Sequence, residues 1–500
     1  MSTVTHSAAP PAAAQPQNSH HRRRRWLILA VIAIAQLMVV LDATIVNIAL
    51  PSAQKDLGFS SDSRQWVVTA YSLAFGALLL LGGRIADLIG RKTTLLIGLT
   101  GFAAASALAG AATNFEVLVT GRALQGVFGA LLAPTALALL TTTFTDAKER
   151  AKAFGIYGAV AGAGGGIGLL LGGVLTEHLD WRWCLYVNLV FAAVALVGAA
   201  ILLPRHRRDR NVKIDIPGTV TVTAGLFALV YGFANAESHS WSAPLTWGCL
   251  ALGAILITLF VWLQQRVAHP LLPMRILADR NRAASLIAMF ISAAGMFGVN
   301  LFLTYYLQGV LGYSPVETGL AFLPMIGALI VISQISSNIL VRFVGPKVIV
   351  PTGMLLAACG LLWLTTLDAT TSYVGHILPP LLVFGAGLGL IMAQSMSQAT
   401  AGIAAADSGV GSATVNTMQQ VGGSIGTALL SSLAASAASS YLVGKDVTSQ
   451  AVQIQATLES YSTAYWWSAS FFAIGMVICG LLYRRGVTRS DPDAAPVVHM

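Results

Sequence analysis

Charged residues are scarce in this chain. Only 10% of its 500 residues are Asp, Glu, Lys or Arg, whereas 56% are hydrophobic. A soluble domain carries roughly 25% charged residues, so a soluble fold is excluded. The apolar runs are continuous and about twice as long as the ten-residue alternating strands of an outer-membrane barrel. The composition therefore predicts an all-α polytopic membrane protein.

Cysteine is also rare, and the four cysteines lie far apart, within or at the edges of apolar stretches. This pattern matches neither a disulfide framework nor a metal-ligand motif, so we interpret them as small core residues and expect no metal site. The sequence also lacks a Gly-x-x-x-x-Gly-Lys phosphate loop. We therefore expect no cofactor, and we expect the proton gradient, not ATP, to supply the energy.

Fourteen apolar stretches are long enough to cross a bilayer as helices, which takes about 20 residues each. Their approximate bounds are 26–50, 66–83, 93–112, 115–142, 153–175, 184–203, 216–235, 245–264, 283–307, 316–341, 346–366, 375–400, 408–436 and 464–483.

The basic residues indicate the orientation of these spans. If the N-terminus lies inside, 24 of the 29 Lys and Arg residues fall in inner segments, 4 fall in outer segments, and Arg122 lies within a span. Lys and Arg accumulate on the cytoplasmic side of membrane proteins. We therefore expect a multi-pass protein of the bacterial plasma membrane with both termini in the cytoplasm. This placement explains the net charge of +9, and we expect no nucleic-acid partner.

A weak internal repeat divides the chain into halves. The segment 83–92 after the second span resembles the segment 338–347 after the tenth, with a glycine and a lysine at matching positions. Repeated halves are typical of secondary transporters, which bind substrate between them. We predict a cytoplasmic N-terminus that is disordered over 1–25, a six-helix bundle over 26–203, a basic loop with two inserted helices over 204–264, a second six-helix bundle over 265–483, and a cytoplasmic tail over 484–500.

Asp42 lies inside the first span, where a charge is costly and usually faces a cavity or a partner. Arg122 is the only basic residue within a span. At 1.5 Å per residue they lie about 12 Å and 10 Å from the outer ends of their spans, so we expect them to share one cavity. They would pair directly or through Gln125 on the same helix face, and we add Asn47 to this set. The alternative is a static buried ion pair.

The segment 83–92 combines an acid, glycines and bases between two spans, and we predict that it forms an inner gate. Gly90 permits a tight reversal. Asp87 would lie against the N-terminal end of the thirteenth span at 408–411, where the helix dipole favours an anion. The alternative is an ordinary charged loop. The candidate gate residues are Gly83, Asp87, Gly90, Arg91 and Lys92.

The fifth span is rich in glycine. Gly164, Gly168 and Gly172 recur at spacing four, with Gly173 beside them. Small residues at every fourth position allow helices to approach closely in lipid. We expect a helix contact that seals the pathway and permits rocking, and packing without a gating role is the alternative.

The second half contains polar residues without charge. Facing inward, these residues would offer hydrogen bonds to a substrate; facing other helices, they would be polar packing groups. The cavity candidates are Asn300, Gln334, Gln394, Asn416 and Gln420.

Taken together, these motifs resemble the fourteen-helix drug:proton antiporters of the major facilitator superfamily. The matching segments are 41–51, 83–92, 122–130, 164–173, 181–188 and 416–423. The resemblance implies a fold of two six-helix bundles plus two inserted helices. It also implies that Asp42 and Arg122 serve proton coupling and substrate, and that the glycine-rich fifth span marks an antiporter. Leu169 departs from the family's usual proline, and Gln419 from a frequent arginine.

From the resemblance we expect a protein that is not an enzyme but a proton-coupled exporter of amphipathic drugs or antibiotics, acting by alternating access. Its partners would be a small amphipathic molecule, neutral or singly cationic, protons and the lipid bilayer, and we expect a monomer. One alternative is an exporter or importer of a single metabolite such as an amino acid or siderophore, because fold does not fix substrate. A membrane enzyme or sensor is the third possibility, but no catalytic set or soluble domain supports it.

Overall fold

The computed structural model describes residues 17–60, 63–144, 147–204, 215–238, 241–268, 270–401, 408–484 and 486. Helices are the only regular secondary structure among them. Within these described residues, twelve helices are long and apolar enough to cross a membrane. Two further helices, α2 with 25 residues and α5 with 32, also reach spanning length. The all-helical membrane architecture is therefore confirmed, and the helices are consistent with fourteen spans.

The first group of helices contains α1 to α6, and two inserted helices follow it. Their bounds are α1 Gln17–Leu57, α2 Gln65–Ile89, α3 Arg91–Gly110, α4 Phe115–Thr143, α5 Ala147–His178, α6 Trp183–Leu202, α7 Ile216–Ser238 and α8 Pro244–Gln264.

A second group contains the remaining helices, among them the short α9 and the π- and 3₁₀-helical segments η1 to η3. Their bounds are α9 Met274–Ala278, α10 Arg280–Tyr305, η1 Tyr306–Val310, α11 Pro315–Asn338, η2 Leu340–Arg342, α12 Pro346–Leu364, η3 Tyr373–Ile377, α13 Leu378–Thr400, α14 Ser408–Leu442 and α15 Gln450–Leu482.

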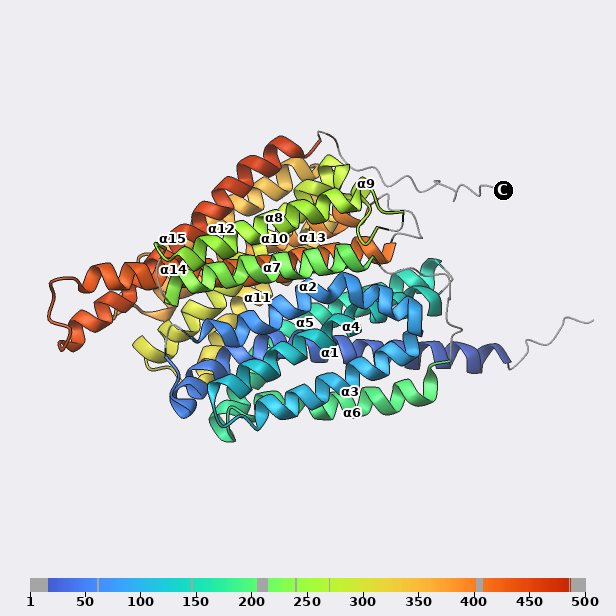
Figure 1. Ribbon diagram of the computed structural model, residues 1–500, viewed down its shortest axis with the longest axis horizontal. Coiled ribbons are helices and arrows are strands. Elements are labelled where there is room, and N and C mark those ends of the chain that lie inside the picture. Colours follow the sequence, from blue (N-terminus) through green and yellow to red (C-terminus); the bar gives the residue numbers. More distant parts are fainter. Residues whose placement is uncertain are drawn as a thin grey trace, which may run out of the picture.

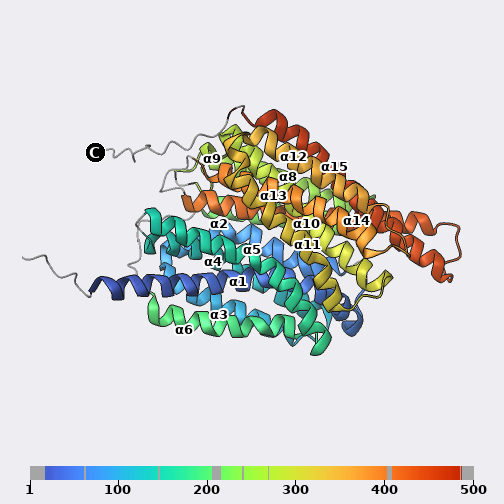
Figure 2. The ribbon, with the colours of Figure 1, turned by 180° about the vertical axis from the view of Figure 1, so that it is seen from behind.

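The two groups pack side by side (Figures 1 and 2). Within the first group α4 packs against α2 and α3, and α1 against α5 and α6; within the second, α13 packs against α11 and α12, and α10 against α14 and α15. The main contacts between the groups are those of α2 with α14 and of α5 with α11. The inserted α7 pairs with α8 and touches both α2 and α14, so it covers one of the seams between the groups.

The first and last helices define the two ends of the molecule. Helix α1 begins and α15 finishes at the same end, at the right in Figure 1, which we call the terminal end. The opposite end, formed by the α1–α2 and α14–α15 connections, is called the distal end here. An even number of crossings places both chain ends on one side of a membrane, as these helices do.

Local sequence signals explain where several helices begin and end. Gly90 separates α2 from α3 with a φ of 94°, a conformation that glycine adopts without a steric penalty. Proline stands in the first turn of α8, α11, α12 and α13, where its missing N–H costs no hydrogen bond. Ser314 and Glu317 form a reciprocal capping box at the start of α11.

Two helices, α1 and α15, extend furthest beyond the predicted apolar spans. Helix α1 begins at Gln17, so the N-terminal segment predicted as disordered over 1–25 ends in helix, and Arg24 and Arg25 tie it to Leu202 and Glu149. Helix α15 begins at Gln450 instead of 464, and with the end of α14 it forms a hairpin beyond the bundle (Figure 1). Hydropathy detects the part of a helix that lies in lipid, whereas polar helical extensions need no apolar run.

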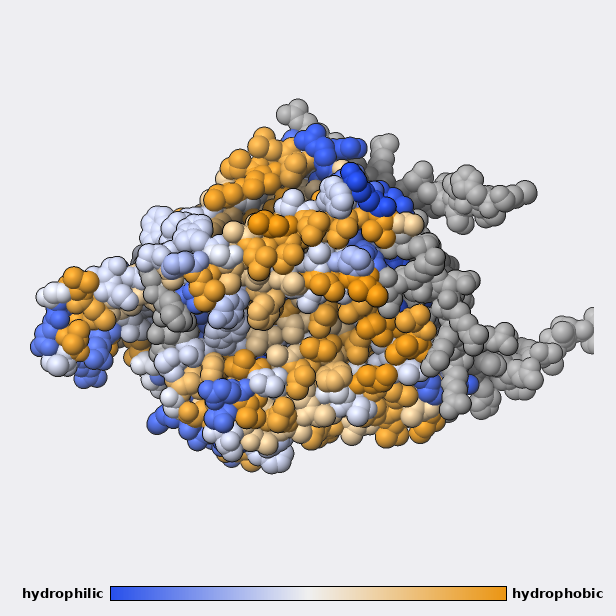
Figure 3. Space-filling model, viewed as in Figure 1, coloured by the Kyte–Doolittle hydropathy of each residue, from blue (hydrophilic) through white to orange (hydrophobic). Residues whose placement is uncertain are grey.

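The surface of the bundle matches a lipid environment. Figure 3 shows an apolar band across the face formed by the helices and hydrophilic residues toward the two ends. Large apolar side chains such as Ile201 and Leu481 are about 70% exposed, at 71% and 68%. Such exposure on many helices would be unfavourable in water but is expected for side chains that face acyl chains. The band therefore supports the membrane assignment.

Candidate functional site

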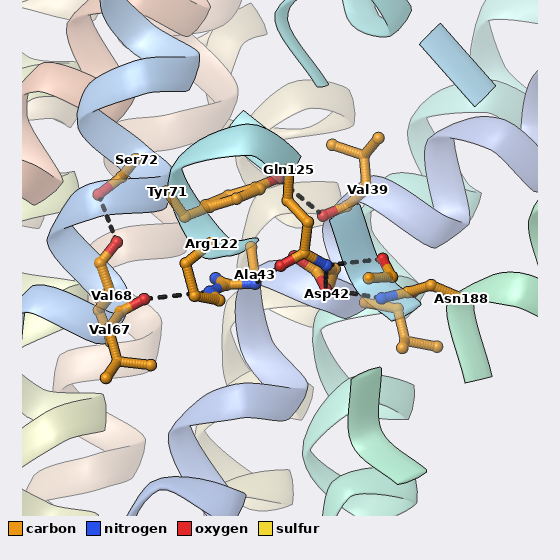
Figure 4. A network of polar contacts seen from close by, with 12 residues as sticks. Val39, Asp42, Ala43, Val67, Val68, Tyr71, Ser72, Arg122, Gln125 and Asn188 are labelled. Atoms are coloured by element: carbon orange, nitrogen blue, oxygen red, sulfur yellow. Dashed lines mark hydrogen bonds and ion pairs between the residues drawn. The ribbon is translucent and has the colours of Figure 1, made fainter. Parts of the chain in front are cut away.

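An ion pair lies in the interior of the first group of helices (Figure 4). The Nη1 atom of Arg122, from α4, is 2.6 Å from the Oδ2 atom of Asp42, from α1. The Asp42 and Arg122 side chains are 0% and 1% exposed. The structure thus brings together the two residues that the sequence placed at the same depth. Both are closed off from solvent in this conformation, and neither faces lipid.

Gln125 joins the two charged side chains, one turn along α4 from Arg122. Its Nε2 donates to Asp42 Oδ1 at 2.8 Å, and its Oε1 accepts from Arg122 Nη1 at 2.9 Å. The same Nε2 also donates to Ser106 Oγ on α3 at 2.7 Å. Asp42 and Arg122 therefore bond each other directly and are also linked through Gln125, whose amide fixes the orientation of the carboxylate.

Asn188, on α6, is a member of this network that the sequence analysis did not single out as a site residue. Its Nδ2 donates to Asp42 Oδ1 at 2.7 Å, and its side chain is fully buried. Within the described part of the chain its Oδ1 has no hydrogen-bond partner. The available signal was its place in the segment 181–188 that resembles the antiporters, but spacing alone does not bring α6 beside α1.

Arg122 is held from a second direction by α2. Its Nε donates to the Val67 carbonyl at 3.0 Å, and its guanidinium lies 4.4 Å from the centroid of the Tyr71 ring. A backbone acceptor and a cation–π contact compensate part of the cost of burying a guanidinium. The ion pair thus connects α1, α4 and α6 to the helix that packs against α14 in the second group.

A small cavity lies next to this network. Its volume is about 10 Å³, and it is lined by Arg122 and by apolar residues of α1, α2, α4 and α6. That volume is about the least that can hold one water molecule. In this conformation the space beside Arg122 therefore has room for at most about one water molecule.

The family model of the Major Facilitator Superfamily matches residues 32–427. The chain belongs to the major facilitator superfamily. It is therefore a multi-pass membrane transporter.

Several curated superfamily members resemble the chain over most of its length. It is 49% identical to the puromycin resistance protein pur8 of Streptomyces alboniger, over 91% of this chain and 89% of that protein. It is 38% identical to the cephamycin export protein CmcT of Amycolatopsis lactamdurans, over 79% and 82%. It is 32% identical to the multidrug resistance protein Stp of Mycobacterium tuberculosis (strain CDC 1551 / Oshkosh), over 80% and 74%.

Solved structures support the same fold. A bacterial homologue of the human lysosomal transporter Spinster, solved in an inward-facing and unoccupied conformation, superposes with a TM-score of 0.63 at 16% identity. The match covers 94% of this chain and 98% of that structure. At this identity the likeness shows only that the superfamily fold is shared.

The glycines of α5 serve two different contacts within this superfamily fold. Gly164, Gly168 and Gly172 lie against α1, where added Cβ atoms would meet Val40, Thr44 and Ile45. Gly173 faces α11 in the other group, with the Pro315 carbonyl 2.6 Å from its ideal Cβ position. The spacing-four stripe therefore packs inside the first group, beside the turn of α1 that carries Asp42, and only Gly173 of the predicted set touches the other group.

We predict that Gly168→Ala lowers both stability and transport. The new Cβ would collide with Thr44 Oγ1 and lie 3.1 Å from the Leu41 carbonyl, so α1 must shift next to Asp42. Overpacking of this kind costs about 1–3 kcal/mol. Thermal unfolding in detergent and initial efflux rates measure the effect. Thr44→Ala should partly rescue the variant, and Gly165→Ala, which meets nothing within 4 Å, should behave like wild type; equal damage in both glycine variants would contradict the packing argument.

The predicted inner-gate segment lies at the terminal end. Arg91 donates to the Ala138 carbonyl at 3.1 Å, and Lys92 donates to the Ala200 and Leu203 carbonyls at 2.6 and 2.7 Å. The two cations therefore cap the C-terminal ends of α4 and α6, where a positive charge is favourable. The side chains of Asp87 and of residues 408–410 lie outside the described residues, so their predicted contact stays a prediction. A Cβ atom added at Gly83 would lie 3.5 Å from the Pro134 side chain on α4, an ordinary van der Waals contact.

The remaining predicted cavity residues do not form one cluster but are spread through the fold. Asn47 donates to the Ala43 carbonyl of its own helix at 3.3 Å. Gln394 is buried and donates to Ser336 Oγ at 3.1 Å. Gln334 is exposed, and its Oε1 accepts a hydrogen bond from Asn338 Nδ2 on the same helix.

Three further candidates lie on α10 and α14. Asn300 is buried, and Asn416 and Gln420 are partly buried. Within the described part of the chain, Asn300 Oδ1 and Gln420 Oε1 have no hydrogen-bond partner. Buried polar atoms without partners are costly, so these two remain candidates for binding a polar ligand group.

We also predict that Asn188→Leu reduces transport several-fold while the protein still folds. Asn188 supplies one of the three side chains that hydrogen-bond the Asp42 carboxylate, and a bond to a charged group contributes roughly 1.5–3 kcal/mol. Initial efflux rates in vesicles give the readout. Asn235→Leu is the matched control, because Asn235 is also buried but bonds Thr246 within the α7–α8 pair; it should lower stability with little effect on transport.

Proposed function

We propose that this transporter exports amphipathic drugs or antibiotics across the bacterial plasma membrane by proton antiport through alternating access. The observation that carries the proposal is the buried Asp42–Arg122 pair, linked to four helices of one group. Ionisable residues within a membrane are costly and usually functional. Asp42 is the group within this pair that takes up and releases a proton.

Protonation of Asp42 changes the balance of charge in the network. The carboxylate becomes neutral, and Arg122 is left as a buried cation without its counter-ion, which is strongly unfavourable. Arg122 keeps its bond to the Val67 carbonyl on α2, and α2 packs against α14 of the other group. Protonation of Asp42 therefore changes the forces on α2 at its contact with α14. Alternating access requires the two groups to move at this contact.

The substrate class comes from the relatives. Two similar proteins are named for resistance to or export of one antibiotic each, and another is named a multidrug resistance protein. An amphipathic organic substrate agrees with the uncharged polar residues of the second group. Because puromycin and cephamycin each name a separate relative, an exporter of one specific compound is the second candidate.

The proposed orientation places the terminal end in the cytoplasm. Arg91 and Lys92 lie there, as do the arginines that precede the first span, in agreement with the cytoplasmic preference of basic residues. The distal end then faces outward, and the segment 83–92 acts as an inner gate. We propose that the protein works as a monomer, because each chain contains both groups of helices.

A growth-inhibition panel tests this function most directly. The full-length protein is expressed in a bacterium that lacks its own efflux pumps and is challenged with chemically diverse antibiotics and cationic dyes. Protection against several unrelated compounds, abolished by an uncoupler, supports multidrug antiport, whereas protection against one compound supports the specific exporter. If expression protects against none of them and no solute moves with protons in vesicles, the proposed function is wrong.

A further inference from the structure

The two groups of helices are tied together at the distal end. Tyr305 donates its hydroxyl to Gln54 Oε1 at 2.6 Å, and Gln308 donates to the Ile48 carbonyl at 3.2 Å. A third bond runs from the Val316 N–H to a carboxylate oxygen of Glu177 at 3.0 Å. These bonds join α1 and α5 to α10, η1 and α11, so the distal end is closed in this conformation.

Arg64, in the α1–α2 connection, adds a charged contact to this closure. Its guanidinium carbon lies 4.1 Å from the centroid of the Tyr305 ring, and the Tyr461 side chain of α15 lies beside it. A guanidinium over an aromatic face is attractive, and more so where water is partly excluded. Arg64 comes from the first group and both tyrosines from the second, so the contact favours the closed end.

Gln65, the next residue along the chain, is the first residue of α2, which packs against α14 of the second group. Ser72 on α2 contacts Ser424 on α14 at 2.9 Å, and Gly76 lies against Gln420, so the two helices run antiparallel. Continued for seven residues toward the distal end, about 10 Å along each helix, this register places Gln65 opposite Ser431.

The seam between α2 and α14 holds several polar side chains that the closed structure leaves unpaired. Gln65 and Thr69 lie on the α2 face that carries Ser72, and Ser431 lies on the α14 face that carries Ser424; all three are buried, at 0–4% exposure. Within the described part of the chain, four of their polar atoms have no hydrogen-bond partner: both polar side-chain atoms of Gln65 and the two hydroxyls. We call these three residues the polar seam.

Arg64 and the adjacent Gln65 therefore have opposite effects on the distal end: one stabilises the closed state and the other destabilises it. Burial of unpaired polar groups is unfavourable, and the polar seam regains hydrogen bonds when the distal end opens to water. We propose that the distal end is a gate in which Arg64, with Tyr305 and Tyr461, favours the closed state while the polar seam favours the open state. This gate rests on the alternating access of the proposed function and gives named residues to its outward-opening step.

The test measures how often the gate opens. Thr427→Cys, one turn from Ser431 and buried, is introduced into a chain whose four native cysteines are replaced by alanine. Intact cells are treated with a membrane-impermeant maleimide. We expect Arg64→Gln to raise the labelling rate about two- to fivefold, the change that corresponds to the free energy of a cation–π contact. Gln65→Leu and Ser431→Ala should each lower the labelling rate by roughly fivefold, the change that corresponds to the free-energy cost of burying one unpaired polar group.

Matched variants separate gating from damage. Arg182→Gln removes a distal cation that pairs with Asp56 inside the first group, and Ser439→Ala removes an exposed α14 hydroxyl; neither should change labelling. Val447→Cys, in the exposed hairpin, should label fully if the distal end faces outward. Ala195→Cys, buried inside the first group, reports unfolding.

The proposal requires opposite shifts for Arg64→Gln and the polar-seam variants. Unchanged labelling, or a shift in the same direction for both, would overturn it, as would labelling of Ala195→Cys that rises in step with Thr427→Cys. The assay needs no transported compound. A clear result therefore remains possible if no antibiotic is exported, and the failure of the gate can be told apart from the failure of the proposed function.

Discussion

Replacing Asp42 by asparagine is expected to reduce proton-coupled efflux to the level of cells without the protein. The variant keeps the size of the side chain but cannot exchange a proton, and it leaves the Arg122 guanidinium buried without a counter-ion. In everted vesicles that hold a pH gradient, substrate should no longer release protons. We expect the protein to remain inserted, because Gln125 and Asn188 offer the new amide hydrogen-bonding partners.

The matched control for this variant is Asp56→Asn. Asp56 also belongs to α1 and forms an ion pair, with Arg182 at 2.8 Å, but its side chain is 46% exposed. Exposed pairs contribute about 0–1 kcal/mol, so transport should stay within about twofold of wild type. If Asp42→Asn transports like wild type at small proton gradients, Asp42 has no role in coupling.

Arg122→Ala is expected to give the largest loss of stability of any single substitution considered. It leaves the Asp42 carboxylate buried and unpaired, a change that costs about 3–5 kcal/mol. Arg122→Lys keeps the charge but cannot reach Asp42, Gln125 and the Val67 carbonyl together, since an ammonium lacks the planar fork of donors. We therefore expect stability and efflux to fall in the order wild type, lysine, alanine, measured by thermal unfolding and vesicle transport.

A double variant distinguishes a coupling site from a static ion pair. Asp42→Leu with Arg122→Met removes both charges at similar volume, and such replacements often restore or increase stability. We expect the double variant to recover much of the stability lost in Arg122→Ala while transport stays absent. Recovery of transport along with stability would mean that the pair only holds helices together, which is the alternative that the sequence left open.

The coupling pair contacts α2, the helix that carries Gln65 and Thr69 of the distal gate. Arg122 bonds the Val67 carbonyl of α2, and Gln65 and Thr69 flank that residue in the polar seam. A rearrangement of Arg122 after protonation therefore acts directly on the part of α2 that meets α14. This connection gives a physical route from proton binding to the opening of the distal end.

Some of the site was accessible from the sequence, and some was not. Asp42 and Arg122 were paired correctly because helical rise converts sequence position into depth, and two isolated charges at one depth have few other partners. Asn188, Ser106 and Tyr71 were not singled out, since depth does not tell which face of a helix a residue occupies.

The division of the α5 glycines shows the same limit. A spacing of four predicts that Gly164, Gly168 and Gly172 share a face, and they do, but the spacing does not name the helix they meet. The structure turns this face to α1 and leaves Gly173 for α11. The start of α15 at Gln450 was missed for a related reason: a polar helix outside the lipid has no hydropathy signal.

The sequence by itself determined the class of protein, the approximate spans and the depth of the lone charges, because each depends on local composition and on the fixed rise of a helix. Only the tertiary structure decided which helices meet and which partners surround Asp42. It also decided that Arg64 and the polar seam lie together at a closed end. Those outcomes depend on the rotation of each helix about its axis and on its neighbours, which arise from the packing of the whole chain.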